Sequence, residues 1–93
     1  MTDQDRLTAL KLDLGIVASN YDDRLNQYLR MAITEIEREG ATLDLEGSID
    51  HNNLVIDYAA WMWRKRDSGE GMPRMIRYAL NNLVFSQKMG DEE

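Results

Sequence analysis

Few residues in this 93-residue chain have the types and spacing that chemistry requires. The chain contains no cysteine and one histidine, His51, so it offers neither a thiolate metal site nor the histidine pairs that bind zinc. His51 lies at the expected start of a helix, where we interpret it as an ordinary helix-terminus residue. Carboxylate pairs such as Asp22–Asp23 are typical of solvated helix charges, and nothing beside them predicts the raised pKa of an acid catalyst. We therefore expect no enzymatic activity, no metal and no cofactor.

The most concentrated group of charged side chains is basic. Arg64, Lys65 and Arg66 are consecutive, and Arg74 and Arg77 follow beyond a glycine-containing linker. Cations in the last turn of a helix stabilise its negative end, which alone can account for the first three. The alternative is that the five cations form a docking patch for an acidic partner or for DNA phosphates. Because all five flank one loop, we favour the docking patch.

The overall charge opposes general DNA binding. The chain has 11 basic and 17 acidic residues, a net charge of −6, and phosphate neutralisation supplies much of the affinity for nucleic acids. The acidic excess lies in residues 1–50, which hold 11 acids and five bases, whereas residues 51–93 hold six of each. No apolar run is long enough to cross a membrane, and the first residues lack the pattern of a signal peptide. We expect no membrane contact.

The chain is expected to form one all-α domain over residues 1–93, because 43% of its residues are hydrophobic and glycines divide it into helical blocks. The expected helices, a short one followed by three longer ones, span residues 3–14, 20–39, 51–67 and 73–88. Ser19 or Asn20 should cap the second helix and Asp50 the third. Residues 41–49 alternate around a glycine and predict a short extended arm or hairpin, and 88–93 should form a disordered tail.

Apolar spacing separates an expected core from a surplus. The core positions are Leu25, Leu29, Ile36, Leu54, Tyr58, Trp61, Ile76, Leu80 and Leu83. The third and fourth helices carry apolar residues on a second face as well, and three helices should not suffice to surround the third. Aromatic residues and methionine are enriched in interface cores, so we expect self-association, with loose packing on the surface as the alternative. The candidate subunit interface is Ile56, Trp63, Met75, Tyr78 and Phe85.

The order of these segments resembles a known family. The most specific piece is Asp50-x-x-x-Leu-Val-x-x-Tyr-Ala-x-Trp61 followed by Arg64–Arg66, with Met72-Pro73 opening the next helix. Together with the block around residues 10–25, this pattern resembles the small head–tail connector proteins of tailed bacteriophages, also called head-completion or DNA-packaging adaptor proteins. The resemblance covers about residues 7–88.

The resemblance implies a structural role. Members of that family are small helical domains that assemble as a ring, commonly dodecameric, below the portal of the filled capsid, where the ring extends the DNA channel. The implied partners are further copies of the chain, the portal protein and the next head-completion or tail protein, and DNA passes without tight binding. The implied location is the head–tail junction of the virion, or the bacterial host cytoplasm before assembly. The basic residues 64–77 would face the portal or a neighbour; the alternative is a small regulatory domain that binds nucleic acid through them.

Overall fold

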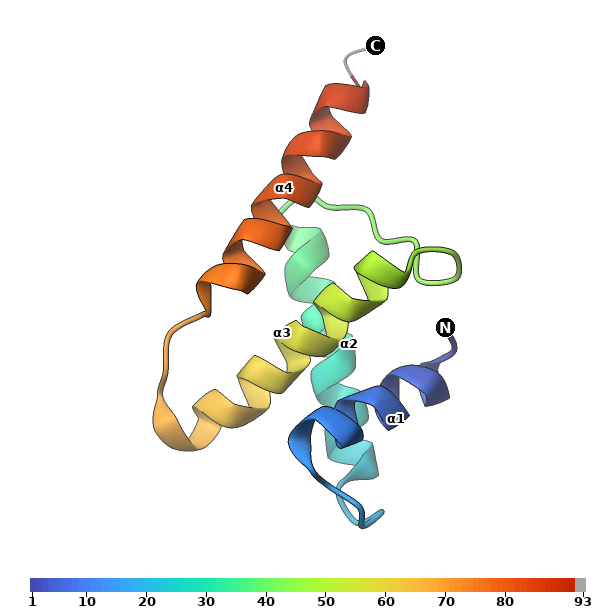
Figure 1. Cartoon of the computed structure of the whole chain (residues 1–93), viewed down its shortest axis with the longest axis vertical. Helices are drawn as coiled ribbons and strands as arrows, with labels where there is room; N and C mark the ends of the chain where they lie inside the picture. The colour runs from blue at the N-terminus through green and yellow to red at the C-terminus, as the bar shows by residue number, and fades with distance from the viewer. Residues whose placement is uncertain (92–93) are drawn as a thin grey trace.

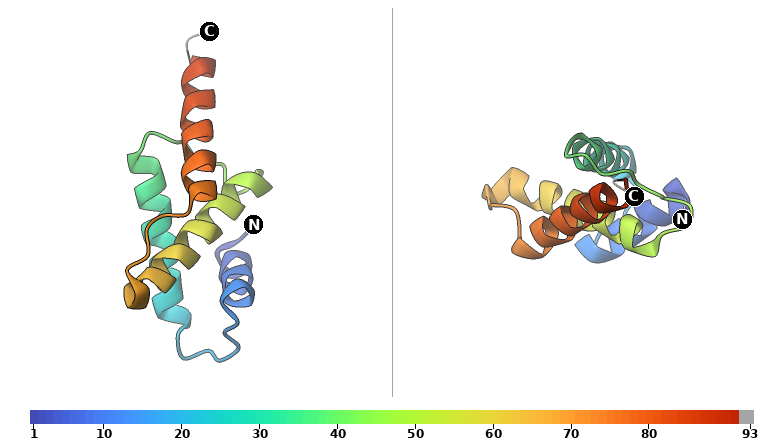
Figure 2. Two further views of the ribbon diagram at one scale, coloured as in Figure 1. Left: turned by 60° about the vertical axis from the view of Figure 1, so that its left-hand side comes forward. Right: turned by 90° about the horizontal axis from the view of Figure 1, so that it is seen from above.

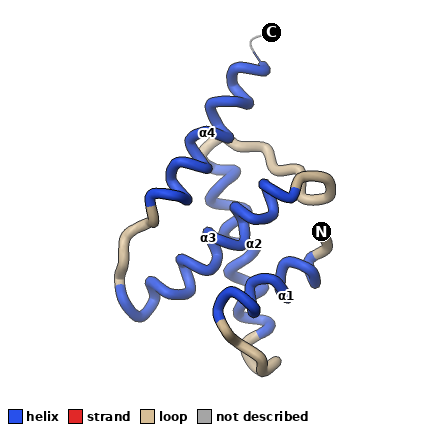
Figure 3. The backbone as a smooth tube through the Cα atoms, viewed as in Figure 1, coloured by secondary structure: helices blue, strands red, loops and turns tan. Residues whose placement is uncertain are grey.

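All four expected helices form, and no strand occurs among residues 1–91, the part of the chain that the computed structural model describes (Figures 1 and 3). The helices are α1 (Asp3–Leu14), α2 (Asp22–Arg38), α3 (Ile49–Ser68) and α4 (Arg74–Asp91). The predicted all-α class is confirmed. No helix in this part of the chain is long and apolar enough to cross a membrane.

The helix ends follow local sequence, with two corrections. Gly15 ends α1 in the left-handed conformation, at φ 71°, as its lack of a side chain allows. The expected cap of α3 at Asp50 is wrong, because Ser48 occupies the cap position and accepts a hydrogen bond from the His51 amide at 3.1 Å. Neither Ser19 nor Asn20 caps α2, which begins after Tyr21 without a side-chain cap.

Two further segments depart in part from expectation. Residues 41–49 were expected as an extended arm or a hairpin, and the hairpin does not form, because the segment between α2 and α3 contains a turn but no strand. Its backbone is instead held by side chains: the Gln87 amide exchanges two hydrogen bonds of 2.7 Å with the Thr42 backbone. The tail expected at 88–93 is helical as far as Asp91, and residues 92 and 93 lie outside the described part.

The helix α3 lies at the centre of the fold and contacts the other three helices (Figure 2). It buries residues on nearly its whole circumference, from Asn52 to Trp63. Every expected core residue is buried except Leu83, which is partly buried against the others. The expectation that three helices cannot surround α3 is therefore wrong, because α1, α2 and α4 cover different sides of it.

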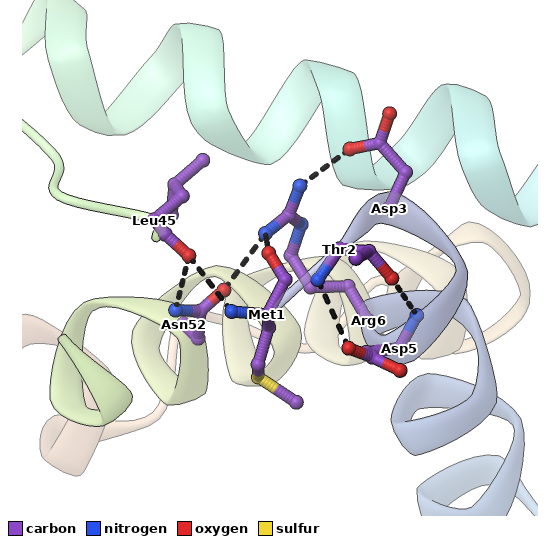
Figure 4. A network of polar contacts seen from close by, with 7 residues as sticks. All are labelled: Met1, Thr2, Asp3, Asp5, Arg6, Leu45 and Asn52. Atoms are coloured by element: carbon purple, nitrogen blue, oxygen red, sulfur yellow. Dashed lines mark hydrogen bonds and ion pairs between the residues drawn. The ribbon is translucent and has the colours of Figure 1, made fainter. Parts of the chain in front are cut away.

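A buried polar network ties α1 to α3 (Figure 4). The Arg6 guanidinium, 6% exposed, donates to the Asn52 side-chain oxygen at 2.9 Å, to the Met1 carbonyl at 3.0 Å and to the Asp3 carboxylate. The Asn52 amide in turn donates to the Leu45 carbonyl at 2.9 Å. The two buried polar side chains of this network, Arg6 and Asn52, thus have partners, which is the condition for burying them without a large loss of stability.

The helix α4 packs less extensively than the others. Its inner face buries Ile76 and Leu80 against the core, while Leu83 and Val84 are partly buried. Its second half extends beyond the remaining helices (Figure 1), and the described chain measures 47 × 29 × 17 Å along its principal axes. Among residues 1–91 no element covers the outer face of α4, so this face is open to a partner.

Candidate interaction surface on the fourth helix

The structure divides the five candidate interface residues into two groups. Met75, Tyr78 and Phe85 are 81%, 61% and 65% exposed on α4. Ile56 and Trp63 are 3% and 9% exposed within the protomer, so they are not available to a second subunit. The expectation that these two residues form a subunit interface is wrong.

Trp63 is buried by contacts that sequence periodicity does not reveal. The rings of Tyr21 and Tyr28 pack edge-on against the indole with centroids 5.7 and 5.4 Å away. The Arg66 guanidinium covers the indole at 3.6 Å from the ring centroid. Tyr21 precedes α2 and Tyr28 lies within it, so this aromatic cluster joins α2 to the second half of α3 and has a structural role.

The large apolar side chains exposed on α4 lie along one face of the helix, and we define them as the apolar stripe: Met75, Tyr78, Phe85 and Met89. With Asn82 between them, they recur at intervals of three, four, three and four residues, the spacing of a helix face that packs along another helix. Met89 is 54% exposed and was missed because it falls in the expected tail. Met89 follows Phe85 by four residues, and this spacing indicates that the stripe continues to it.

A groove of about 470 Å³ lies on one side of the stripe, between α3 and α4. Its apolar lining includes Leu54, Ile76 and Leu83, and acidic Asp50 and Asp57 also line it, on the α3 side. A smaller hollow of about 260 Å³ lies on the other side of α4, where Leu80, Asn81, Val84, Phe85 and Lys88 meet Glu39 at the end of α2. The stripe is therefore a ridge between two depressions.

The five cations do not form one free patch. The Lys65 ammonium lies 4.4 Å from the centroid of the Trp61 ring, and Arg66 covers Trp63. Arg77 forms an ion pair with Glu39 at 2.8 Å. Arg64 and Arg74 are exposed, one on α3 and one at the start of α4. Three of the five cations expected to dock a partner thus already interact within the protomer.

His51 has a structural partner. Its Nδ1 atom accepts a hydrogen bond of 2.8 Å from the Asp44 amide, which holds the loop before α3 against the first turn of that helix. Among residues 1–91, no group of three or more histidine, aspartate or glutamate side chains is arranged to hold a metal ion. The hydrogen bond to Asp44 agrees with our interpretation of His51 as a residue of the helix terminus.

The ionised carboxylate of Asp57 is destabilised by its surroundings in the folded protein. Asp57 is exposed at its tip but partly desolvated in the groove wall, and this partial burial raises the pKa of its carboxyl above 3.8; the nearby Asp13 carboxylate raises it further, and Arg64 opposes both effects. The folded protein therefore holds the proton of Asp57 more tightly than the unfolded chain does. The contribution of Asp57 to the free energy of unfolding therefore falls as the pH rises from about the pKa of the unfolded chain to above the pKa of the folded protein.

We expect Asp57→Asn to stabilise the monomer above this pH range, because the amide removes the unfavourable charge. The gain should be at most about 0.5 kcal/mol, since Asp57 is exposed and its interactions are screened. Below pH 3.8, the ordinary value for this group, both proteins are neutral at this position and the difference should vanish. Urea unfolding of both proteins at pH 3 and pH 7 measures the difference in their free energies of unfolding. An Asp57→Asn variant less stable than the original protein at pH 7 would contradict the expectation.

The sequence has no significant match to any protein-family model or to any curated protein, and no solved structure is significantly similar. The likeness to connector proteins therefore depends only on the residues quoted above from the sequence.

Proposed function

We propose that this protein is a structural subunit of the phage head–tail connector type, which acts by docking and not by catalysis. In this role copies assemble as a ring on the portal vertex, complete the filled head and extend the DNA channel toward the tail. The observation that carries the proposal is the apolar stripe of α4, whose four large side chains share one uncovered face. Single exposed apolar residues are common on protein surfaces, but several large ones aligned on one helix face are typical of an interaction site.

The charge of the chain supports this proposal over nucleic-acid binding. A channel wall must let duplex DNA slide, and a net charge of −6 disfavours retention of phosphates. The alternative, a regulatory domain that grips DNA through residues 64–77, needs cations that are free to neutralise phosphates. Arg77 is paired with Glu39, and Lys65 and Arg66 lie over tryptophan rings of the same chain, so a phosphate would have to compete with these contacts.

The test is assembly of a stripe variant. We expect Tyr78→Ser/Phe85→Ser to melt within a few degrees of the original protein, because both side chains are exposed, yet to weaken co-sedimentation with the portal protein of the same genome at least tenfold. The matched control is Leu12→Ser, which removes an apolar side chain 78% exposed on α1, and it should assemble normally. An original protein that ignores the portal, or a stripe variant that binds it equally well, would contradict the proposal.

A further inference from the structure

We propose that α4 of one copy seats its Tyr78–Phe85 edge in the α3–α4 groove of a second copy, with the two α4 helices parallel. The inference extends the proposed function, from which it takes only the expectation that copies meet through the stripe. Each copy then uses two different surfaces, the Tyr78–Phe85 edge for one neighbour and the α3–α4 groove for the other. Such a contact is heterologous, and a repeated heterologous contact produces a ring when its rotation closes.

Helical geometry separates the two faces. The positions 75, 82 and 89 lie on the side of the stripe toward α3, and Met75 and Asn82 line the groove. Tyr78 and Phe85 are seven residues apart, so they project from the same side of α4 about 10 Å from one another. Ala79 and Ser86 are the small residues on the groove side, and both line it. A projecting aromatic edge and an apolar groove beside small side chains are complementary in shape.

The charges on the two faces are complementary too. Arg74 and Lys88 lie on the ridge side of α4, near the two ends of the stripe, and both are exposed. The groove holds the exposed acids Asp57 and Asp50. Since α3 and α4 run in roughly opposite senses (Figure 1), Asp57 lies toward the start of α4 and Asp50 toward its second half.

Parallel helices bring these opposite charges together. With α4 of the second copy parallel to the first, Arg74 approaches Asp57 across the seam, where Ala79 and Ser86 leave room for long side chains. Lys88, about 20 Å further along α4, then lies beyond Asp50 on the same side of the seam. An antiparallel, twofold pairing would place Arg74 of each copy on the same side of the seam as Lys88 of the other, and like charges oppose that arrangement. A neighbouring cation would also relieve the unfavourable charge of Asp57, whose pKa burial and Asp13 raise.

Cross-linking tests the contact directly, because the natural chain has no cysteine. Asn81→Cys places a thiol beside the ridge, and Asn53→Cys places one in the groove; both side chains are exposed. With a short bismaleimide, each single variant alone should remain monomeric on a denaturing gel. A mixture of the two should give a dimer, and the double variant should give a ladder of multimers. Adding Tyr78→Ser/Phe85→Ser should reduce the ladder at least tenfold.

The charge pairing has its own test. In the double-cysteine background, Arg74→Glu should reduce the ladder at least fivefold, and Arg74→Glu with Asp57→Arg should restore it. Circular dichroism on every variant confirms that the helices remain. No dimer in the mixture, or cross-linking of Asn81→Cys to itself, would overturn the inference. A ladder without portal binding would support this contact and reject the proposed function, whereas portal binding without a ladder would do the reverse.

Discussion

Trp63→Ala is expected to lower the free energy of unfolding by about 3–4 kcal/mol, as truncation of a large buried aromatic side chain does. The indole is 9% exposed and contacts Tyr21, Tyr28 and the Arg66 guanidinium. Truncation removes both edge-on ring contacts and leaves a cavity between α2 and α3. A small domain has little stability in reserve, so a large fraction of the chain should be unfolded at 37 °C. Chemical denaturation followed by circular dichroism measures the change.

The control is Trp63→Phe, which keeps an aromatic ring between the tyrosines and should lose less than half as much stability. Trp61→Ala should cost about as much as Trp63→Ala, because the Trp61 side chain is 8% exposed and its indole N–H donates to the Glu70 carbonyl at 3.2 Å. If Trp63→Ala melts like the original protein and only assembly suffers, then Trp63 is an interface residue after all.

Asn52→Leu should have the second large effect, a loss of about 2–4 kcal/mol. Asn52 is 1% exposed, and leucine has the same branching and the same number of side-chain non-hydrogen atoms, although its methyl groups are bulkier, so packing should account for the smaller part of the loss. The loss arises because the buried Arg6 guanidinium would lose the oxygen that accepts its 2.9 Å hydrogen bond. The Leu45 carbonyl would also lose one of its two donors and keep only the Met1 amino group at 3.2 Å. Thermal melting at neutral pH measures the change.

The double variant Arg6→Met/Asn52→Leu separates this mechanism from a steric one. Removing the charge together with its partner leaves fewer unsatisfied polar groups in the interior, so the double variant should be more stable than Asn52→Leu alone. Asp5→Ala serves as the comparison, because it removes only the exposed reciprocal cap of α1, in which the Thr2 amide donates to Asp5 at 3.0 Å. Additive losses in the double variant would argue against coupling between Arg6 and Asn52.

The positions of the helices could be predicted because residues close together in the sequence determine them. Apolar spacing located all four helices, and Gly15 marked the end of α1 through the positive φ that it adopts. Segment 41–49 could not be predicted in the same way, since its conformation depends on Gln87 and His51, which lie far along the chain or in the next helix. Hydrogen bonds of this kind leave no periodic pattern.

The candidate site was predicted only in part. The face of α4 with Met75, Tyr78 and Phe85 was recognisable because helical spacing shows which residues share a side. Ile56 and Trp63 were misassigned because a helical projection shows how much of α3 is apolar but not how much of it α1, α2 and α4 can cover. Tyr21 illustrates the difficulty: it precedes α2, so its position over Trp63 depends on how the loop before that helix folds.

The manner in which α4 is joined to the rest of the chain has a mechanical consequence. A linker, residues 69–73, precedes it, its contact with α3 is the least extensive of the main helix pairings, and its far half is held laterally by the Gln87–Thr42 hydrogen bonds. Displacing α4 from the core therefore costs less free energy than separating α1, α2 and α3, and breaking the Gln87–Thr42 hydrogen bonds is part of that cost. The angle between α4 and the other three helices is accordingly the softest degree of freedom of the fold.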